Sequence, residues 1–219
     1  MRRTFEPYRT SVHSQNGEDG VVREILRRIG LPAGPGFCVD VGAADGETYS
    51  NVRALLDQGW DGILVDNNAD NIDLLLLLAR DLPGCVQVIR RTMGPGVRDR
   101  LDALLLETHA PKRFDVLSID VDSHDLQIWR DMRLYEPAVV IVEVNSAIPL
   151  GVRQVHSAES PGASFTSMLE VGQKKGYVLA CHTGNMIFVD GRYVDRLGLT
   201  AEEREHPERL FNYGGPPLA

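Results

Sequence analysis

The chain has 219 residues, of which 43% are hydrophobic and 25% charged, and its net charge is −8 at pH 7. These values are typical of one folded domain with a sizeable core. The acidic balance disfavours binding to bulk nucleic acid or to an anionic membrane, because both need a positive surface. The longest apolar run, Leu74–Ala79, is far shorter than the ~20 residues that cross a bilayer. No apolar core follows Arg2 and Arg3, so we expect no secretory signal.

Helical and strand patterns alternate through the first two thirds of the chain. A helix is predicted over Val21–Ile29, stopped by Gly30 and Pro32. Five apolar strands are predicted at Phe37–Val41, Gly62–Val65, Val86–Ile89, Phe114–Ile119 and Ala138–Val142. The helices between them are predicted at Thr48–Gln58, Asn71–Arg80, Val97–Glu107 and Asp125–Met132. Strands that are apolar on both faces suit a parallel sheet covered by helices, and the alternation predicts a doubly wound Rossmann-like α/β fold.

The pattern changes after Asn145. The stretch Ser146–Gly162 is irregular, and a helix is predicted over Ala163–Lys175. Two strands follow, Tyr177–Cys181 and Met186–Val189, and their short link predicts a hairpin with an antiparallel C-terminal strand. We therefore expect one domain over residues 1–219, with an N-terminal helical cover (1–36), a Rossmann-like core (37–190) and a C-terminal tail (191–219).

Three cysteines are odd in number and too widely spaced for a metal-binding pair. Cys38 and Cys85 stand in apolar strand-like runs, where cysteine behaves as a small hydrophobe. Together with Cys181 they favour a reducing, cytoplasmic location.

A glycine-containing turn, Val39–Gly46, follows the first strand and precedes a helix. Its glycines would let the backbone approach a ligand, and the helix N-terminus would face that ligand. The third glycine of the dinucleotide motif G-x-G-x-x-G is missing, which disfavours an NAD-dependent oxidoreductase. Asp40, within the strand end, suits a cationic cofactor better than a pyrophosphate. The alternative is a packing turn that binds nothing.

Asp66 ends the second strand about 20 residues beyond the turn, where Rossmann-like folds place an acid on ribose hydroxyls. Asp66 could instead cap the next helix. The turn and the acid together favour a ligand that contains adenosine.

Segments across most of the chain, from Ser14 to Val189, resemble one family of enzymes. Phe37–Asp66 resembles motifs I and II of class I S-adenosylmethionine-dependent methyltransferases, and the closing hairpin is typical of their variant of the Rossmann plan. Five segments resemble the bacterial FkbM-type group: Ser14–Gly20, Val39–Gly46, Ser118–Asp122, Val142–Asn145 and Gly162–Ser164. Ser123 and His124 stand where that group often has glycine and asparagine.

This resemblance implies S-adenosylmethionine as the cofactor. The expected contacts lie on the turn, the strand ends and the polar segment before the first helix, where Ser14 or Asn16 would also cap that helix. They are Gln15, Asn16, Asp40, Gly42, Ala43, Asp45, Ser50, Asn51, Asp66, Asn67 and Asp120.

Four polar side chains end the fourth and fifth strands: Asp120, Asp122, Glu143 and Asn145. Neighbouring parallel strands bring these ends together, and such oxygen donors suit a divalent cation such as Mg²⁺. The cation could orient an acceptor hydroxyl and lower its pKa, an arrangement similar to metal-dependent O-methyltransferases of the catechol and macrolide-sugar types. Without a metal, Asp120 would hold the methionine part of the cofactor and Asp122 would cap the next helix.

Histidine near this edge is a candidate base. His124 could take the acceptor's proton, with Asp120 as the second catalytic candidate; a loop histidine without a role is the alternative. His156 and His182 are weaker candidates, and we place His182 on the opposite side of the sheet. The stretch Ser146–Gly162 is long enough to be a lid over the acceptor.

Family resemblance implies transfer of the methyl group to a small-molecule hydroxyl on a sugar or natural-product scaffold, by direct displacement between aligned groups. The alternatives are an N-methyltransferase without metal and a non-catalytic module that binds an adenosine ligand. The expected partner is the small-molecule acceptor, and the chain could form a homo-oligomer.

Overall fold

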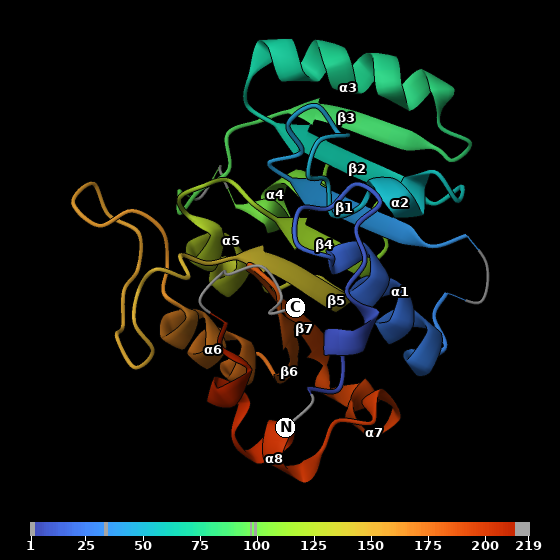
Figure 1. Cartoon of the computed structure of the whole chain (residues 1–219). Coiled ribbons are helices and arrows are strands. Elements are labelled where there is room, and N and C mark those ends of the chain that lie inside the picture. The colour runs from blue at the N-terminus through green and yellow to red at the C-terminus, as the bar shows by residue number, and fades with distance from the viewer. Residues whose placement is uncertain (1–2, 33–34, 97, 99, 213–219) are drawn as a thin grey trace.

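The computed structural model describes residues 3–32, 35–96, 98 and 100–212. Its centre is a seven-stranded sheet of order β3-β2-β1-β4-β5-β7-β6 (Figure 1). The strands are β1 (Phe37–Val41), β2 (Asp61–Asp66), β3 (Val86–Arg90), β4 (Arg113–Ile119), β5 (Glu136–Glu143), β6 (Tyr177–His182) and β7 (Asn185–Asp190). Strands β1 to β5 are parallel, and β7 pairs antiparallel with both β5 and β6. The predicted Rossmann-like sheet with its antiparallel hairpin strand is confirmed.

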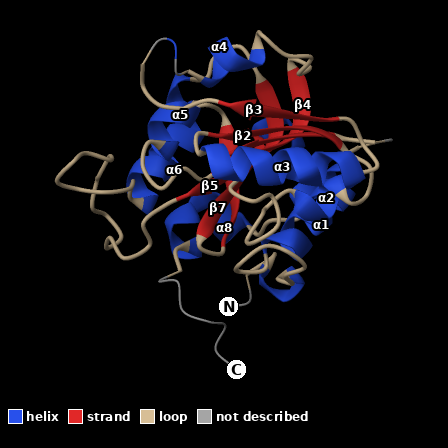
Figure 2. Ribbon diagram, turned by 90° about the horizontal axis from the view of Figure 1, so that it is seen from above, coloured by secondary structure: helices blue, strands red, loops and turns tan. Residues whose placement is uncertain are grey.

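Helices cover both faces of this sheet (Figure 2). One face carries α1 (Glu18–Ile29), α2 (Arg53–Leu56) and α3 (Ala69–Asp81). The other carries α4 (Leu101–Leu105), α5 (Asp125–Asp131) and α6 (Phe165–Lys174). The central strands are buried on both sides, which explains their uninterrupted apolar sequence.

Local chemistry sets where the longer helices begin and end. Gly30 ends α1 in a left-handed conformation, and its N–H donates to Leu26 O. Asn68 caps α3 by accepting the N–H of Asp70, and Ser164 caps α6 by accepting that of Ser167. The residue that precedes α1 is Gly17, so neither Ser14 nor Asn16 stands at the cap position itself. The Ser14 hydroxyl nevertheless accepts the N–H of Asp19, in the first turn of α1, at 3.1 Å, which supports the expected capping role of Ser14.

The helix predicted over Thr48–Gln58 is much shorter, because α2 begins only at Arg53. The Asp45 carboxylate accepts the N–H groups of two residues that follow it, and the Ser50 hydroxyl accepts the N–H of Arg53 at 3.1 Å. Tyr49 between them has a φ of 60°. Short polar side chains therefore hold this segment as a loop, in competition with the helix.

Two other expectations change in detail. Helix α4 is shorter than predicted, and the predicted first residue, Val97, lies outside the described residues. Cys85 precedes β3 and is exposed, so its assignment to a buried apolar run was wrong. Cys38 and Cys181 are buried, and all three thiols are free.

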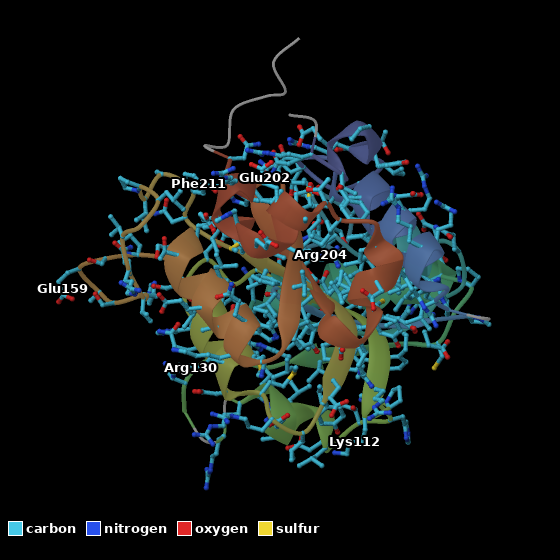
Figure 3. The ribbon with its side chains drawn as sticks, turned by 90° about the horizontal axis from the view of Figure 1, so that it is seen from below. Lys112, Arg130, Glu159, Glu202, Arg204 and Phe211 are labelled. Atoms are coloured by element: carbon cyan, nitrogen blue, oxygen red, sulfur yellow. The ribbon has the colours of Figure 1, made fainter. Side chains whose placement is uncertain are left out.

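Beyond β7 the chain turns back under the sheet through η3 (Gly191–Tyr193), α7 (Val194–Leu197), α8 (Ala201–Glu205) and η4 (Pro207–Leu210). Phe211 is 7% exposed and lies beside these helices (Figure 3). The N-terminal segment is tied to this region, since Arg3 donates to Phe211 O at 2.9 Å and the N–H of Thr4 to Glu203 at 2.7 Å. Within the described chain, no helix combines the length and apolar character that crossing a membrane requires.

Candidate functional site

Three cavities adjoin at the carboxyl ends of the parallel strands. Their volumes are about 360, 300 and 470 Å³, and we call them the nucleoside-side, central and acidic cavities. Asp120 and Asp122 line all three, so the cavities form one continuous cleft. A larger cavity of about 760 Å³ between α1 and α2 shares only Asn51 with this cleft and contains none of the acidic rim.

The nucleoside-side cavity is bounded by the end of β2 and by the loop after β3, with Asn67 and Met93 among its lining residues. Asp66 lies at its wall and is 9% exposed. Its carboxylate accepts the N–H of Ala44 at 2.9 Å, the N–H of Asn68 at 2.8 Å and the Nδ2 group of Asn71 at 3.2 Å. Asp66 thus joins the glycine turn to the start of α3, while a carboxylate retains lone pairs for further donors.

The two glycines of the turn are required by packing. Gly42 has a φ of +87°, and a Cβ added to it would lie 1.7 Å from the backbone oxygen of Asp120. A Cβ on Gly46 would lie 2.5 Å from Leu78 Cδ2. Contact between protein segments therefore explains why glycine is needed at both positions. From the sequence alone, the same glycines are explained by the approach of a ligand.

The central cavity contains most of the cofactor residues predicted on the turn and its loop. Its lining includes Gln15, Asp40, Gly42, Ala43, Ser50, Asn51 and Asp120. Asp45 does not line any of the three cavities, because its carboxylate is turned to the backbone of its own loop. Burial raises the pKa of Asp40 to about 6, and the Ser118 hydroxyl, which hydrogen-bonds to this carboxyl, opposes the rise.

The N-terminal segment reaches the cleft next to the hairpin of β6 and β7. Gln15 and Asn16 line the acidic cavity. Glu18, which is fully buried, accepts the N–H of Asn16 at 2.7 Å and the hydroxyl of Thr183 at 2.6 Å. The sequence did not reveal this role of Glu18. The polar density of Ser14–Gly20 was the available signal.

The rim of the acidic cavity brings together the carboxylates predicted at the ends of β4 and β5. One oxygen from each of Asp120, Asp122 and Glu143 lies within 4.8 Å of the others. Burial raises the pKa of Asp120 to about 8, and the neighbouring carboxylate of Glu143 adds to the rise. Burial also raises the pKa of Glu143 to about 7. Asp122 has a φ of 58°, a strained conformation of the kind found at functional sites.

Asn145 lines the same cavity. Its side-chain oxygen accepts the N–H of Ala147 at 3.1 Å, and its Nδ2 group donates to Pro161 O at 3.5 Å. The amide therefore holds the first turn of the irregular stretch. Its predicted role as a fourth metal ligand stays a prediction.

The structure places His124 in the nucleoside-side cavity and not in the acidic one. Its ring meets the ring of His156 edge-on, with centroids 4.6 Å apart, and its Nδ1 has no hydrogen-bond partner among the described residues. Burial lowers the pKa of His124, and His156 lowers it further. The carboxylates of the rim are thus better placed than His124 to face an acceptor.

His182 lies at the same edge of the sheet as the cleft, contrary to expectation. Strand β6 is parallel to β5, since both pair antiparallel with β7, so the end of β6 belongs to the carboxyl edge. The buried ring accepts the N–H of Asn212 at Nδ1, 2.8 Å away, and its Nε2 lies 3.1 Å from Ser146 Oγ. Burial lowers the pKa of His182 to about 4.

The stretch Ser146–Gly162 is irregular as predicted and projects from the body of the molecule (Figure 1). Its two ends line the acidic cavity through Ser146, Pro161 and Gly162. Glu159, in the outer part of the loop, stands away from the body (Figure 3). The loop is therefore positioned beside the acidic cavity, as a lid would be.

Comparison with known proteins identifies the fold. No protein-family model and no curated protein sequence matches the chain. A CurJ carbon methyltransferase is similar in structure, with a TM-score of 0.50, 15% identity, and coverage of 78% of this chain and 52% of that one. TrmK of M. capricolum, solved with S-adenosyl-homocysteine, has a TM-score of 0.49, 12% identity, and coverage of 83% and 73%. The chain has the fold of S-adenosylmethionine-dependent methyltransferases, although it spans only about half of the CurJ chain.

Proposed function

We propose that the chain is an S-adenosylmethionine-dependent methyltransferase that acts on a hydroxyl group of a small molecule, such as a sugar or a natural-product scaffold. The observation that carries this proposal is the continuity of the cleft at Asp120, which links the nucleoside-side cavity to the acidic cavity. A cofactor extended along the cleft would place its methyl group beside the acidic rim, where an acceptor could lie.

The charges of the cleft support a sulfonium cofactor over a dinucleotide. Lysine and arginine are absent from the described residues that line the central and acidic cavities. A pyrophosphate there would face Asp40 and Asp120 without a counter-charge, whereas a positively charged sulfonium would be attracted to them. Adenosine would occupy the nucleoside-side cavity beside Asp66 and Asn67.

The acidic rim suits a divalent cation held by Asp120, Asp122 and Glu143. Three carboxylates crowded at this distance repel one another, and hard oxygen donors are the ligands that Mg²⁺ prefers. When bound, such an ion would orient the acceptor hydroxyl and lower its pKa. An N-methyltransferase without metal is the alternative, in which Asp120 would instead hold the methionine part of the cofactor.

In the proposed reaction the acceptor oxygen forms a bond to the methyl carbon as the carbon–sulfur bond breaks, and S-adenosylhomocysteine leaves. The residues of the chain align the two reactants and exclude water, with the loop Ser146–Gly162 covering the acceptor. Without a bound cation, the acceptor proton would pass to one rim carboxylate, that of Asp120 or of Glu143. His124, the other candidate base, is on the nucleoside side of the cleft.

We propose that the chain acts on a small molecule and not on nucleic acid or a membrane, in keeping with its net charge of −8. A cytoplasmic location is supported by its three free thiols.

Calorimetry on the full chain with S-adenosylmethionine, S-adenosylhomocysteine and NAD tests the cofactor. We expect both sulfur compounds to bind and NAD not to bind. If neither S-adenosylmethionine nor S-adenosylhomocysteine binds, the proposal is wrong. Gln15→Ala, at an exposed residue of the cleft, should weaken binding, whereas Glu159→Gln in the projecting loop is the matched control. Binding without turnover of any hydroxylated acceptor would instead favour a non-catalytic module.

A further inference from the structure

Strand β3 is the last strand at one side of the sheet, and its outer edge is open. The N–H of Gly62 donates to Cys85 O at 3.0 Å, and the N–H of Arg91 donates to Asp66 O at 2.9 Å. The backbone groups of Cys85 and Arg91 therefore face β2. In a parallel ladder the residues between them, Val86, Val88 and Arg90, direct their backbone groups to the other side. No backbone hydrogen bond within the described chain covers that side.

Helix α3 lies over this edge, at the top of the molecule in Figure 1. Leu75 and Leu78 point toward the glycine turn, where both approach Gly46. With 3.6 residues per turn, the opposite flank of the helix carries Asp73, Leu76 and Arg80, at spacings of three and four. Leu76 is 45% exposed, so this flank presents an apolar residue between two opposite charges.

The charges on this flank of α3 are arranged so that two copies of the flank can pair. Asp73 and Arg80 are both exposed, and neither takes part in any ion pair found among the described residues. If a second copy approached antiparallel about a twofold axis near Leu76, Asp73 would face Arg80 of the partner subunit, and the two Leu76 side chains would meet. If the axis also passes the middle residue of β3, Val88, the open backbone groups of both edges pair.

We propose that this surface, the outer edge of β3 with the Asp73–Leu76–Arg80 flank of α3, binds a second copy of the chain. The two sheets then form one continuous sheet across a twofold interface, in which the same residues contribute from both sides. The cleft lies at the carboxyl ends of the central strands, so this assembly is independent of the proposed function.

Charge reversal tests the pairing at positions where folding is not at risk. Sedimentation equilibrium of the wild type should give a dimer, while Asp73→Arg or Arg80→Asp alone should weaken it by about tenfold, because each places like charges together at two symmetric contacts. The double variant Asp73→Arg, Arg80→Asp should restore it. A wild type that stays monomeric at high micromolar concentration, or a dimer indifferent to the single variants, overturns the proposal.

Crosslinking tests the position of the axis. In a Cys85→Ser background, Leu76→Cys should form a disulfide-linked dimer on mild oxidation, since the two copies of residue 76 meet. Leu74→Cys is the matched control, because Leu74 is also exposed on α3 but on the other flank. Crosslinking of Leu74→Cys and not of Leu76→Cys would show that a different surface is used.

Discussion

The backbone oxygen of Asp120 occupies the space that a side chain at position 42 would need, 1.7 Å from the place of a Cβ on Gly42. The turn after β1 and the end of β4 are thereby held together, although 78 residues of sequence separate them. The glycine turn and the acidic rim of the cleft thus share one rigid junction.

Gly42→Ala should therefore destabilise the protein by more than ~2 kcal/mol, through the clash added to the cost of a positive φ. Gly151→Ala is the control, because Gly151 has a φ of +90° but nothing within 4 Å of an added Cβ. Thermal unfolding would compare the two. Equal losses would mean that the backbone conformation alone, and not the contact with Asp120, makes glycine necessary.

Asp66→Asn should weaken binding of S-adenosylhomocysteine by about tenfold or more, because a single amide oxygen cannot accept the hydrogen bonds from Ala44, Asn68 and Asn71 and those of the ribose hydroxyls as well. Titration calorimetry measures the affinity. Asp61→Asn is the control: Asp61 accepts the N–H of Cys85 at the other end of β2, so it should leave affinity unchanged. If both variants bound the cofactor like the wild type, Asp66 would have only a structural role.

Mg²⁺ should raise the melting temperature more at about pH 8 than at about pH 6. The pKa values of Asp120 and Glu143 are raised to about 8 and about 7, so their protonated forms stabilise the fold in acid, and that stability is lost as pH rises through these values. Ions compete with protons for the same oxygens, so binding strengthens as the protons leave. Asp122→Asn should reduce the response; a shift that is equal at both pH values would contradict a site on these carboxylates.

His182 should make stability fall as the solution is acidified. Its pKa is lowered from 6.5 to about 4 in the fold, so the unfolded chain takes up a proton first, and the stabilising contribution present above pH 6.5 is lost as pH falls toward 4. The loss is about 3 kcal/mol. Denaturant unfolding across this range should show a smaller loss for His182→Gln, with His109→Gln, on the surface, as the control.

Much of this architecture could be predicted from the sequence, because buried parallel strands such as Ala138–Val142 leave an unmistakable apolar run. The convergence of Asp120 and Glu143 also followed, from strand order alone. The predictions that failed concerned either local side-chain contacts or the order of the strands in the sheet. The loop before Arg53 is held by the side chains of Asp45 and Ser50, a competition that periodicity does not register.

The position of His182 could not be derived from periodicity either. The hairpin was predicted, but its placement with β7 between β5 and β6 was not, and that order alone puts His182 at the cleft edge. The packing that requires glycine at position 42 was equally hidden, since it involves a residue of a neighbouring strand.

The hydrogen bond from Thr4 to Glu203 joins segments 199 residues apart, and it has a consequence for synthesis. Strand β7, which is inserted beside β5, and the segment that receives Thr4 both leave the ribosome late. The N-terminal residues therefore lack the contact with Glu203 while most of the chain is translated. A nascent chain halted before residue 185 would expose the edge of β5 that β7 covers, so the sheet is complete only after β7 has been translated.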